Sequence, residues 1–134
     1  MAIDGVRFDM PDTPANAAAF GRPRTQRNGQ SIERAYPQMQ AIFLSETGTH
    51  MVVEAYIKPG QPGEFNVATS WLRKAPSGCL VLQDRGFYGY RPLAEATEHG
   101  VGVLGRVGKH VVFKRTETFI DGSYLAVIHP SLKD

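Results

Sequence analysis

The sequence predicts an α/β protein with a mixed sheet and helices, followed by a β-rich segment. Two stretches with helical spacing of apolar residues alternate with two short apolar runs, Cys79–Leu82 and Val101–Leu104. Such alternation of helix and strand is typical of an α/β sheet. From Val107 to Asp134 apolar and polar residues alternate instead, which is typical of strands with one exposed face.

The N-terminal part of the chain is predicted to hold one strand and a long irregular segment. Ala2–Met10 spaces its apolar residues among polar ones and should form the first strand. Pro11–Pro37 is rich in proline, glycine and arginine, so most of it is expected to be irregular and exposed. A short helical turn is expected within it, at Ala15–Phe20.

A hairpin and a helix should follow. The apolar runs Ala41–Leu44 and Met51–Ile57 are separated by a short polar turn around Gly48, which predicts an antiparallel hairpin. After several prolines and glycines, four apolar residues fall on one helical face and predict an amphipathic helix packed on the sheet. These residues are Phe65, Ala68, Trp71 and Leu72.

The middle of the chain continues with strands and a second helix. Cys79–Leu82 is wholly apolar and predicts a strand that is buried on both faces. A helix is expected from Arg91 to His99, ended by Gly100, and Val101–Leu104 should form the next strand. Beyond them an all-β segment is expected, with a hairpin turn at Asp121-Gly122. Its strands are predicted at Val111–Phe113, Thr116–Ile120 and Tyr124–Ile128.

Composition limits the classes of protein to consider. The 134 residues suffice for one hydrophobic core, and 42% hydrophobic with 21% charged residues is ordinary for a soluble protein. No apolar run approaches a membrane span, and Met1–Met10 has no leader pattern, so a cytoplasmic location is expected. The single cysteine, Cys79, excludes an internal disulfide and a cysteine zinc site. A net charge of +2 says little about nucleic acid, because phosphate binding depends on clustered charge.

Two acids are candidate metal ligands, because both are expected at strand ends. Asp4 belongs to the first predicted strand, and Asp84 directly follows the apolar run Cys79–Leu82. In an open α/β sheet, central strands bring such distant residues together at one edge. Carboxylate oxygens are suited to Mg²⁺ or Mn²⁺, which serve phosphodiester chemistry. The alternative is structural, since Asp84-Arg85-Gly86 also has the composition of a turn.

Several short motifs occur along the chain in a specific order. They are Asp4-Gly5, Pro11-Asp12-Thr13-Pro14-Ala15-Asn16, Phe20-Gly21-Arg22-Pro23, Tyr36-Pro37-Gln38, Glu46-Thr47-Gly48-Thr49-His50, Asp84-Arg85-Gly86-Phe87-Tyr88, Leu104-Gly105-Arg106-Val107 and Asp121-Gly122-Ser123-Tyr124-Leu125. In this order and spacing, over nearly its whole length, the chain resembles the insertion-sequence-four family of DDE transposases. It departs from the family at Val6, where a hydroxyl residue usually follows Asp-Gly.

The resemblance implies a fold and an activity. It implies a ribonuclease-H-like core at residues 1–106 and the start of a β-rich insertion at 107–134. It also implies metal-dependent cleavage and transfer of DNA strands, with Asp4 and Asp84 as catalytic ligands of Mg²⁺ or Mn²⁺. The family's third carboxylate, a Glu in a Tyr-Arg-Glu-Lys-like helix, would lie beyond Asp134, so the acid triad is expected to be incomplete here. The family's N-terminal DNA-binding region would precede Met1.

Basic residues gather at two places that suit DNA phosphates. The predicted loop carries Arg22, Arg24 and Arg27, followed by Arg34, and its alternative is a surface loop without a ligand. Arg106 and Lys109 follow the strand Val101–Leu104, where the resemblance places the active face. DNA, as transposon ends and target, is therefore the expected partner. A second copy of the chain is a further candidate, because an unpaired strand offers a sheet edge, and no membrane partner is expected.

Other residues have structural interpretations. His50 and His110 lack a second histidine at helical spacing and are expected on hairpin surfaces. Glu95 and Glu98 should form the solvated face of the second helix. Two alternatives to an enzyme stay open: a catalytically inactive transposase remnant or DNA-binding fragment, and an unrelated small α/β module in which the acids are turn residues.

Overall fold

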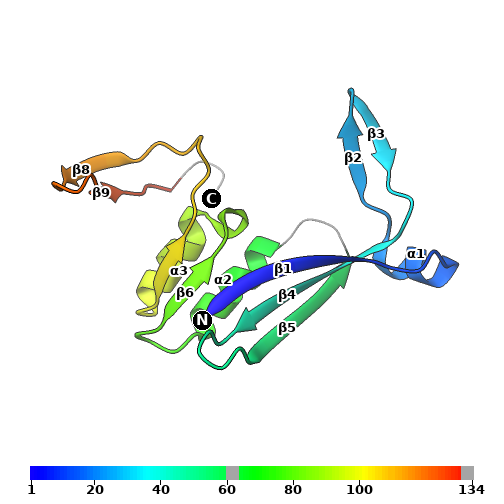
Figure 1. The fold of residues 1–134 in the computed structure, drawn as a ribbon, viewed down its shortest axis with the longest axis horizontal. Coiled ribbons are helices and arrows are strands. Elements are labelled where there is room, and N and C mark those ends of the chain that lie inside the picture. The colour runs from blue at the N-terminus through cyan, green and yellow to red at the C-terminus, as the bar shows by residue number, and fades with distance from the viewer. Residues whose placement is uncertain (60–63, 131–134) are drawn as a thin grey trace. The chain divides into compact units, whose positions relative to one another are not determined.

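A computed structural model describes residues 1–59 and 64–130, and their side chains except those of 64 and 65. Its elements, strands in both parallel and antiparallel pairs together with helices, confirm the predicted mixed α/β class (Figure 1). The chain divides into two compact units, Met1–Val67 and Ala68–Asp134. No helix among the described residues has the length and apolar character needed to cross a membrane.

The first unit is built on three antiparallel strands. β1 (Ala2–Asp9) pairs with β4 (Gln38–Ser45), and β4 pairs in turn with β5 (Val52–Pro59). These strands confirm the predicted first strand and the predicted hairpin. The middle strand, β4, supplies most of the buried residues, among them Ile42 and Leu44.

A short helix and a hairpin connect β1 to β4. Helix α1 (Pro14–Phe20) begins at Thr13, whose hydroxyl accepts the Asn16 N–H at 3.2 Å. This cap, with proline in the first turn, explains why the short predicted helix forms. The helix ends at Gly21, whose φ of 69° is readily adopted only by glycine.

The prediction of an irregular loop over Pro11–Pro37 is wrong for its second half. Strands β2 (Arg24–Arg27) and β3 (Gln30–Glu33) form an antiparallel hairpin within it. Asn28 and Gly29 close the turn with φ values of 51° and 77°, as a two-residue hairpin turn requires. The eight strand residues are all exposed, so no apolar alternation reveals the strands, whereas the Asn-Gly pair does indicate the turn.

Helix α2 (Glu64–Lys74) follows, with its first turns in the first unit and its remainder in the second. Of the four apolar residues predicted on its inner face, Ala68, Trp71 and Leu72 are buried. The side chain of Phe65 lies outside the described residues. The predicted amphipathic helix is therefore confirmed for the part that the structure describes.

The second unit contains a parallel strand pair joined by a helix. β6 (Leu80–Gln83) pairs with β7 (Gly102–Gly105), and α3 (Tyr90–Glu98) forms the crossover between them. The 3-10 helix η1 (Arg85–Phe87) lies between β6 and α3. Both strands and the second helix were predicted. However, Leu80 and Leu82 are 51% and 38% exposed, so the prediction that β6 is buried on both faces is wrong: only the face of Val81 and Gln83 is covered.

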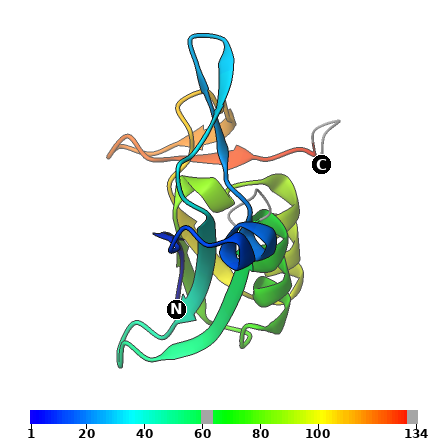
Figure 2. The ribbon, with the colours of Figure 1, turned by 90° about the vertical axis from the view of Figure 1, so that its right-hand side faces the viewer.

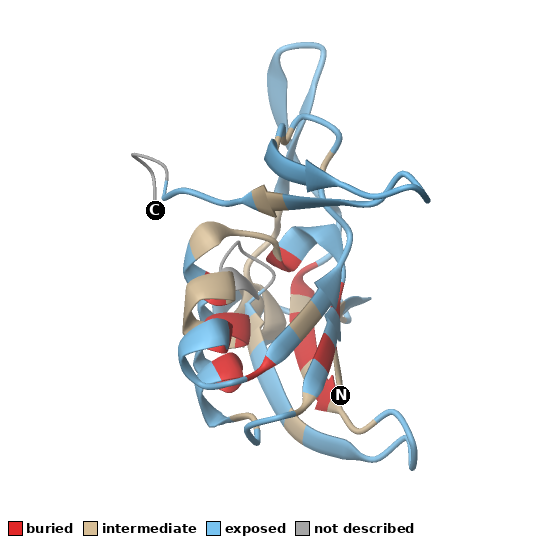
Figure 3. Cartoon of the chain, turned by 90° about the vertical axis from the view of Figure 1, so that its left-hand side faces the viewer, coloured by how far each residue is buried: buried red, intermediate tan, exposed pale blue. Residues whose placement is uncertain are grey.

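The tail of the second unit is a further antiparallel hairpin. β8 (Lys114–Thr118) pairs antiparallel with β9 (Tyr124–Val127), across the predicted turn at Asp121-Gly122. Residues 111–113 are not a strand, contrary to prediction, because they complete a turn in which the Val111 N–H donates to the Gly108 carbonyl at 2.9 Å. Figures 2 and 3 show the ribbon from its two sides, and in Figure 3 the hairpins β2–β3 and β8–β9 are almost wholly exposed.

Candidate functional site

Asp4 lies on the exposed side of β1. The pleat alternates along the strand, so Ile3 is buried while Asp4 points to solvent. Its carboxylate accepts the N–H of Gly5 at 2.8 Å. Asp4 is the third residue of β1 and not at its end as predicted, because the pairing of β1 with β4 continues to Asp9.

Asp84 follows directly after β6 and is exposed, as predicted. It occupies the cap position of η1 with extended backbone, and its side chain makes no capping hydrogen bond. Only its backbone carbonyl serves the turn, by accepting the N–H of Phe87 at 3.0 Å. The structural alternative, an aspartate side chain that caps the turn, therefore does not account for Asp84.

Two neighbours hold the turn after Asp84 in place. Phe87 is buried and anchors η1. Gln83 is buried as well, and its side-chain amide faces the Phe87 carbonyl at 3.5 Å. On the other side of Gln83, a Cβ atom on Gly105 would approach the Gln83 carbonyl oxygen to 3.0 Å. The close pairing of β6 with β7 at this point thus depends on residue 105 being a glycine, which has no side chain.

The register of the parallel pair sets a basic residue next to the acid. Gln83 pairs with Gly105, so Asp84 and Arg106 are the first residues beyond the carboxyl ends of adjacent strands. The crossover through α3 is what brings these two residues to one edge. This edge is where open α/β sheets place their ligands.

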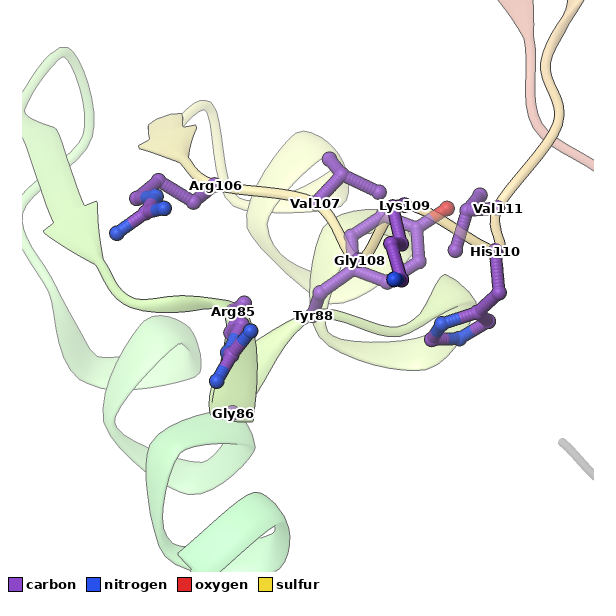
Figure 4. Close-up of a pocket in the computed structure, with 9 residues that line it drawn as sticks. All are labelled: Arg85, Gly86, Tyr88, Arg106, Val107, Gly108, Lys109, His110 and Val111. Carbon is purple, nitrogen blue, oxygen red and sulfur yellow. The ribbon is translucent and has the colours of Figure 1, made fainter.

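A cationic pocket adjoins this edge (Figure 4). It has a volume of about 670 Å³, and its four basic side chains are Arg85, Arg106, Lys109 and His110. No acidic residue is among its described lining. Figure 4 shows the Tyr88 ring on the pocket wall, and this ring packs edge-on against Phe113 with centroids 6.3 Å apart.

The composition of the pocket suits an anion with several oxygens, such as a phosphate group. The structure brings Arg106 and Lys109, both predicted as DNA contacts from the sequence, together with Arg85 and His110. Arg85 was considered only as part of a turn, although its position beside Asp84 is a usable signal. His110 was expected on a hairpin surface; it is exposed but lines this pocket.

The predicted arginines of the N-terminal segment differ in their surroundings. Arg24 and Arg27 project from the exposed hairpin β2–β3. Arg22, with 24% of its side chain exposed, binds the Asp12 carboxylate and the Ala35 carbonyl at the base of the hairpin. Arg22 therefore braces the hairpin, a role that the sequence did not indicate.

Two other acids have structural partners. The Glu46 carboxylate accepts the Thr49 hydroxyl and the N–H groups of Gly48 and Thr49, at 2.6 to 2.8 Å. These bonds, with the Thr49 hydroxyl as the largest cause, lower the pKa of Glu46 to about 2. The turn around Glu46 is thus held by its own hydrogen bonds as the connection between β4 and β5, and no ligand role is needed to explain it.

Glu95 was expected to be solvated, which is wrong. It forms a two-point ion pair with Arg73, in which Arg73 Nε lies 2.7 Å from Glu95 Oε2. The hydrogen bond from Arg73 lowers the pKa of Glu95. This pair joins α2 to α3, while Glu98 is exposed as predicted.

Asp4 and Asp84 lie in different compact units, and each is an exposed carboxylate with oxygen donors of the kind that Mg²⁺ and Mn²⁺ prefer. Their chemistry therefore fits a divalent cation. Among the described residues, no three or more histidine, cysteine or acidic side chains form a group that could hold a metal ion.

Comparisons with known proteins give consistent results. A family model described as "Transposase DDE domain" matches residues 1–131. The chain is 33% identical over 87 residues to the Escherichia coli (strain K12) protein named "Putative transposase InsZ", covering 65% of this chain and 28% of that protein. It is 33% identical over 88 residues to "Transposase InsG for insertion sequence element IS4" of the same organism, covering 66% and 19%. No solved structure matches.

Proposed function

The chain belongs to the family of transposase DDE domains, and from this we propose that it acts in DNA transposition by metal-dependent cleavage and transfer of DNA strands. The match spans less than a third of each relative. The activity is therefore proposed for the protein domain to which these residues belong. The observation that carries the proposal is Asp84, an exposed, uncapped carboxylate at the edge of a parallel strand pair and beside a cationic pocket.

In this proposal Asp4 and Asp84 are ligands of Mg²⁺ or Mn²⁺. When bound, such a cation activates the attacking oxygen and stabilises the leaving oxygen at a phosphodiester. The two aspartates supply only part of the ligand set that the family resemblance implies. We further propose that the core, residues 1–106, has the ribonuclease-H-like fold, and that 107–134 begin the β-rich insertion.

The basic residues would position the DNA. Arg106 and Lys109, with Arg85, offer guanidinium and ammonium donors to backbone phosphates next to Asp84. Arg24 and Arg27 offer further contacts on the hairpin, with Arg22 as its brace. Transposon ends and target DNA are the proposed partners, together with a second copy of the chain.

Metal binding tests the ligand assignment directly. In a Mn²⁺ titration followed by electron paramagnetic resonance, Asp4→Asn and Asp84→Asn should each weaken binding at least about tenfold. Glu117→Gln, which removes the same charge from exposed β8, is the control and should bind as the unaltered chain does. If Asp4→Asn has no effect, Asp4 is not a ligand and the shared site is refuted.

Nicking of supercoiled DNA tests the activity. With Mn²⁺, nicking by the unaltered chain should disappear in Asp84→Ala. Equal nicking by both proteins would refute the metal assignment. DNA binding without any nicking would overturn the enzymatic proposal for this chain. It would support the alternative, an inactive DNA-binding fragment, whose DNA binding the four basic side chains of the pocket favour.

A further inference from the structure

The hairpin β2–β3 has no evident role in the core of its unit. All eight residues of its strands are exposed. Figures 1 and 2 show it standing away from the strands β1, β4 and β5 of the same unit. An exposed two-stranded hairpin is marginal on its own, so a hairpin of this kind needs other means to hold its shape.

Local interactions hold the two strands of the hairpin in their paired arrangement. The Asn28-Gly29 turn has the left-handed backbone that matches the twist of two paired strands. At the base, the Arg34 N–H donates to the Pro23 carbonyl at 2.8 Å, one pair beyond Arg24 and Glu33. Arg22 closes the same end through Asp12 and Ala35. The hairpin is therefore an ordered ribbon fastened at both ends.

The pairing register divides the hairpin into two different faces. Residues directly opposite each other share a face, and the faces alternate along each strand. One face, here called the arginine face, comprises Thr25, Arg27, Gln30, Ile32 and, by continuation of the pairing, Arg34. The other, the balanced face, comprises Arg24, Gln26, Ser31 and Glu33. The arginine face thus has two positive charges and no acid, whereas Arg24 and Glu33 offset each other.

We propose that the arginine face enters the major groove of double-helical DNA. Two paired strands lie about 4.8 Å apart, and the major groove, about 12 Å wide, admits a two-stranded ribbon. The face carries the side chains that contact base edges: arginine for guanine, glutamine for adenine, and the apolar groups of Thr25 and Ile32 for the thymine methyl. The inference rests on the proposed function only in taking DNA as the partner.

The residues of the arginine face also argue against other binding partners for this face. Two copies packed through this face would bring Arg27 and Arg34 against like charges. A lipid surface would need more than Ile32 as an apolar contact. Single-stranded DNA is bound largely by stacking on aromatic rings, and neither strand of the hairpin contains one.

A pair of matched substitutions tests the assignment. Arg27→Gln and Arg24→Gln each remove one arginine from the same exposed strand, on opposite faces. Binding of the whole chain to a fluorescent mixed-sequence duplex of about 20 base pairs, two helical turns, is measured by anisotropy in EDTA. Arg27→Gln should weaken binding at least about fivefold, and Arg27→Gln with Arg34→Gln further. Arg24→Gln removes a proposed phosphate contact from the balanced face and should weaken binding by no more than about twofold, without loss of groove contacts.

A groove-specific readout accompanies the affinities. The unaltered chain should protect guanine N7, a major-groove atom, from dimethyl sulfate, and Arg27→Gln should lose this protection. Equal weakening by both single substitutions, or protection that survives Arg27→Gln, would overturn the inference. Unchanged amide resonances of Asn28 and Gly29 confirm that each variant keeps the hairpin.

The outcome of this DNA-binding test can be distinguished from the outcome of the tests of the proposed function. EDTA removes metal from the binding assay, so loss of Mn²⁺ binding to Asp4 and Asp84 leaves this test intact. The converse result is also possible: nicking depends on Asp84, but Arg27→Gln binds duplex DNA as tightly as the unaltered chain does. That result would refute the hairpin assignment and leave the proposed function intact.

Discussion

At the scale of single residues, Gly105 controls the spacing of the strands that present Asp84 and Arg106. A Cβ atom there would lie 2.9 Å from the Gln83 side chain and 3.0 Å from its backbone carbonyl. Because backbone cannot move aside as a side-chain end can, Gly105→Ala should destabilise the fold by about 1 to 3 kcal/mol. It should also weaken Mn²⁺ binding, as the turn after Gln83 shifts.

Gly102 provides the matched control for this prediction. It belongs to the same strand, but the nearest atom to an added Cβ would be the flexible end of Leu80, at 3.2 Å, and the nearest backbone atom would be the Cys79 carbonyl oxygen at 3.7 Å, an ordinary contact distance. Gly102→Ala should therefore change the free energy of unfolding, measured by urea denaturation, by no more than about 0.5 kcal/mol. Equal losses for the two variants would show that the strand spacing at Gly105 has no special importance.

The lowered pKa of Glu46 leads to a prediction about how stability depends on pH. Its folded pKa of about 2 lies below the ordinary value of 4.5, so its hydrogen bonds contribute stability above pH 4.5. That contribution is lost as the pH falls from about 4.5 through about 2. Thr49→Val removes the largest cause, and the pKa of Glu46, followed by carbon NMR of its carboxyl group, should rise toward 4.5.

The neighbouring threonine serves as the control. Thr47 is exposed in the same turn, and Thr47→Val should leave the pKa of Glu46 near 2. A Glu46 titration that is identical in Thr49→Val and the unaltered chain would contradict the assigned hydrogen bonds.

At the scale of secondary-structure elements, the Arg73–Glu95 pair fastens α2 to α3. Glu95→Gln should lower the melting temperature, while Glu98→Gln on the exposed side of α3 should not. A double-mutant cycle with Arg73→Met should give a favourable coupling that shrinks between low salt and about 1 M NaCl, where charges are screened beyond about 3 Å. A coupling of zero at low salt would mean that the pair contributes nothing.

The elements that were predicted and those that were missed differ in how they are stabilised. β4, α2 and α3 bury apolar residues at regular spacing, and this spacing is visible in the sequence. The hairpin β2–β3 buries nothing, so its strands leave no such pattern; the Asn28-Gly29 turn was its only local signal. The ion pair of Glu95 depends on a residue in another helix, which a single sequence does not reveal.

At the scale of the whole molecule, the small net charge conceals an uneven distribution of basic and acidic residues. The chain has 15 basic and 13 acidic residues, yet the pocket holding Arg106 and Lys109 has no acid in its described lining. Binding to duplex DNA should therefore depend steeply on salt. Lys109→Gln should reduce the slope of log K against log salt by about 0.9, the value for one phosphate contact.

Lys114, exposed on β8 outside the described lining of the pocket, is the matched control. Lys114→Gln should leave the salt slope unchanged. If both substitutions reduce the slope equally, the DNA contact is spread over the surface and is not centred on the pocket.

The sequence was sufficient for the fold class and for the family, because ordered motifs and apolar spacing extend along the whole chain. It also indicated the position of Asp84, directly after an apolar run that forms a strand. It did not indicate the open face of β6, because an apolar run looks the same whether one face or both are covered. The pocket likewise depends on a crossover that brings Arg85 beside residues 106–111.

The parallel pairing of β6 and β7 has a consequence for how such a protein can change over time. Asp84 and Arg106 are neighbours because Gln83 and Gly105 are paired, whatever the length of chain that runs between them through α3. Substitutions at exposed positions of α3, such as Arg91 and Glu98, can therefore accumulate in descendants while the acid and its basic neighbour stay in place.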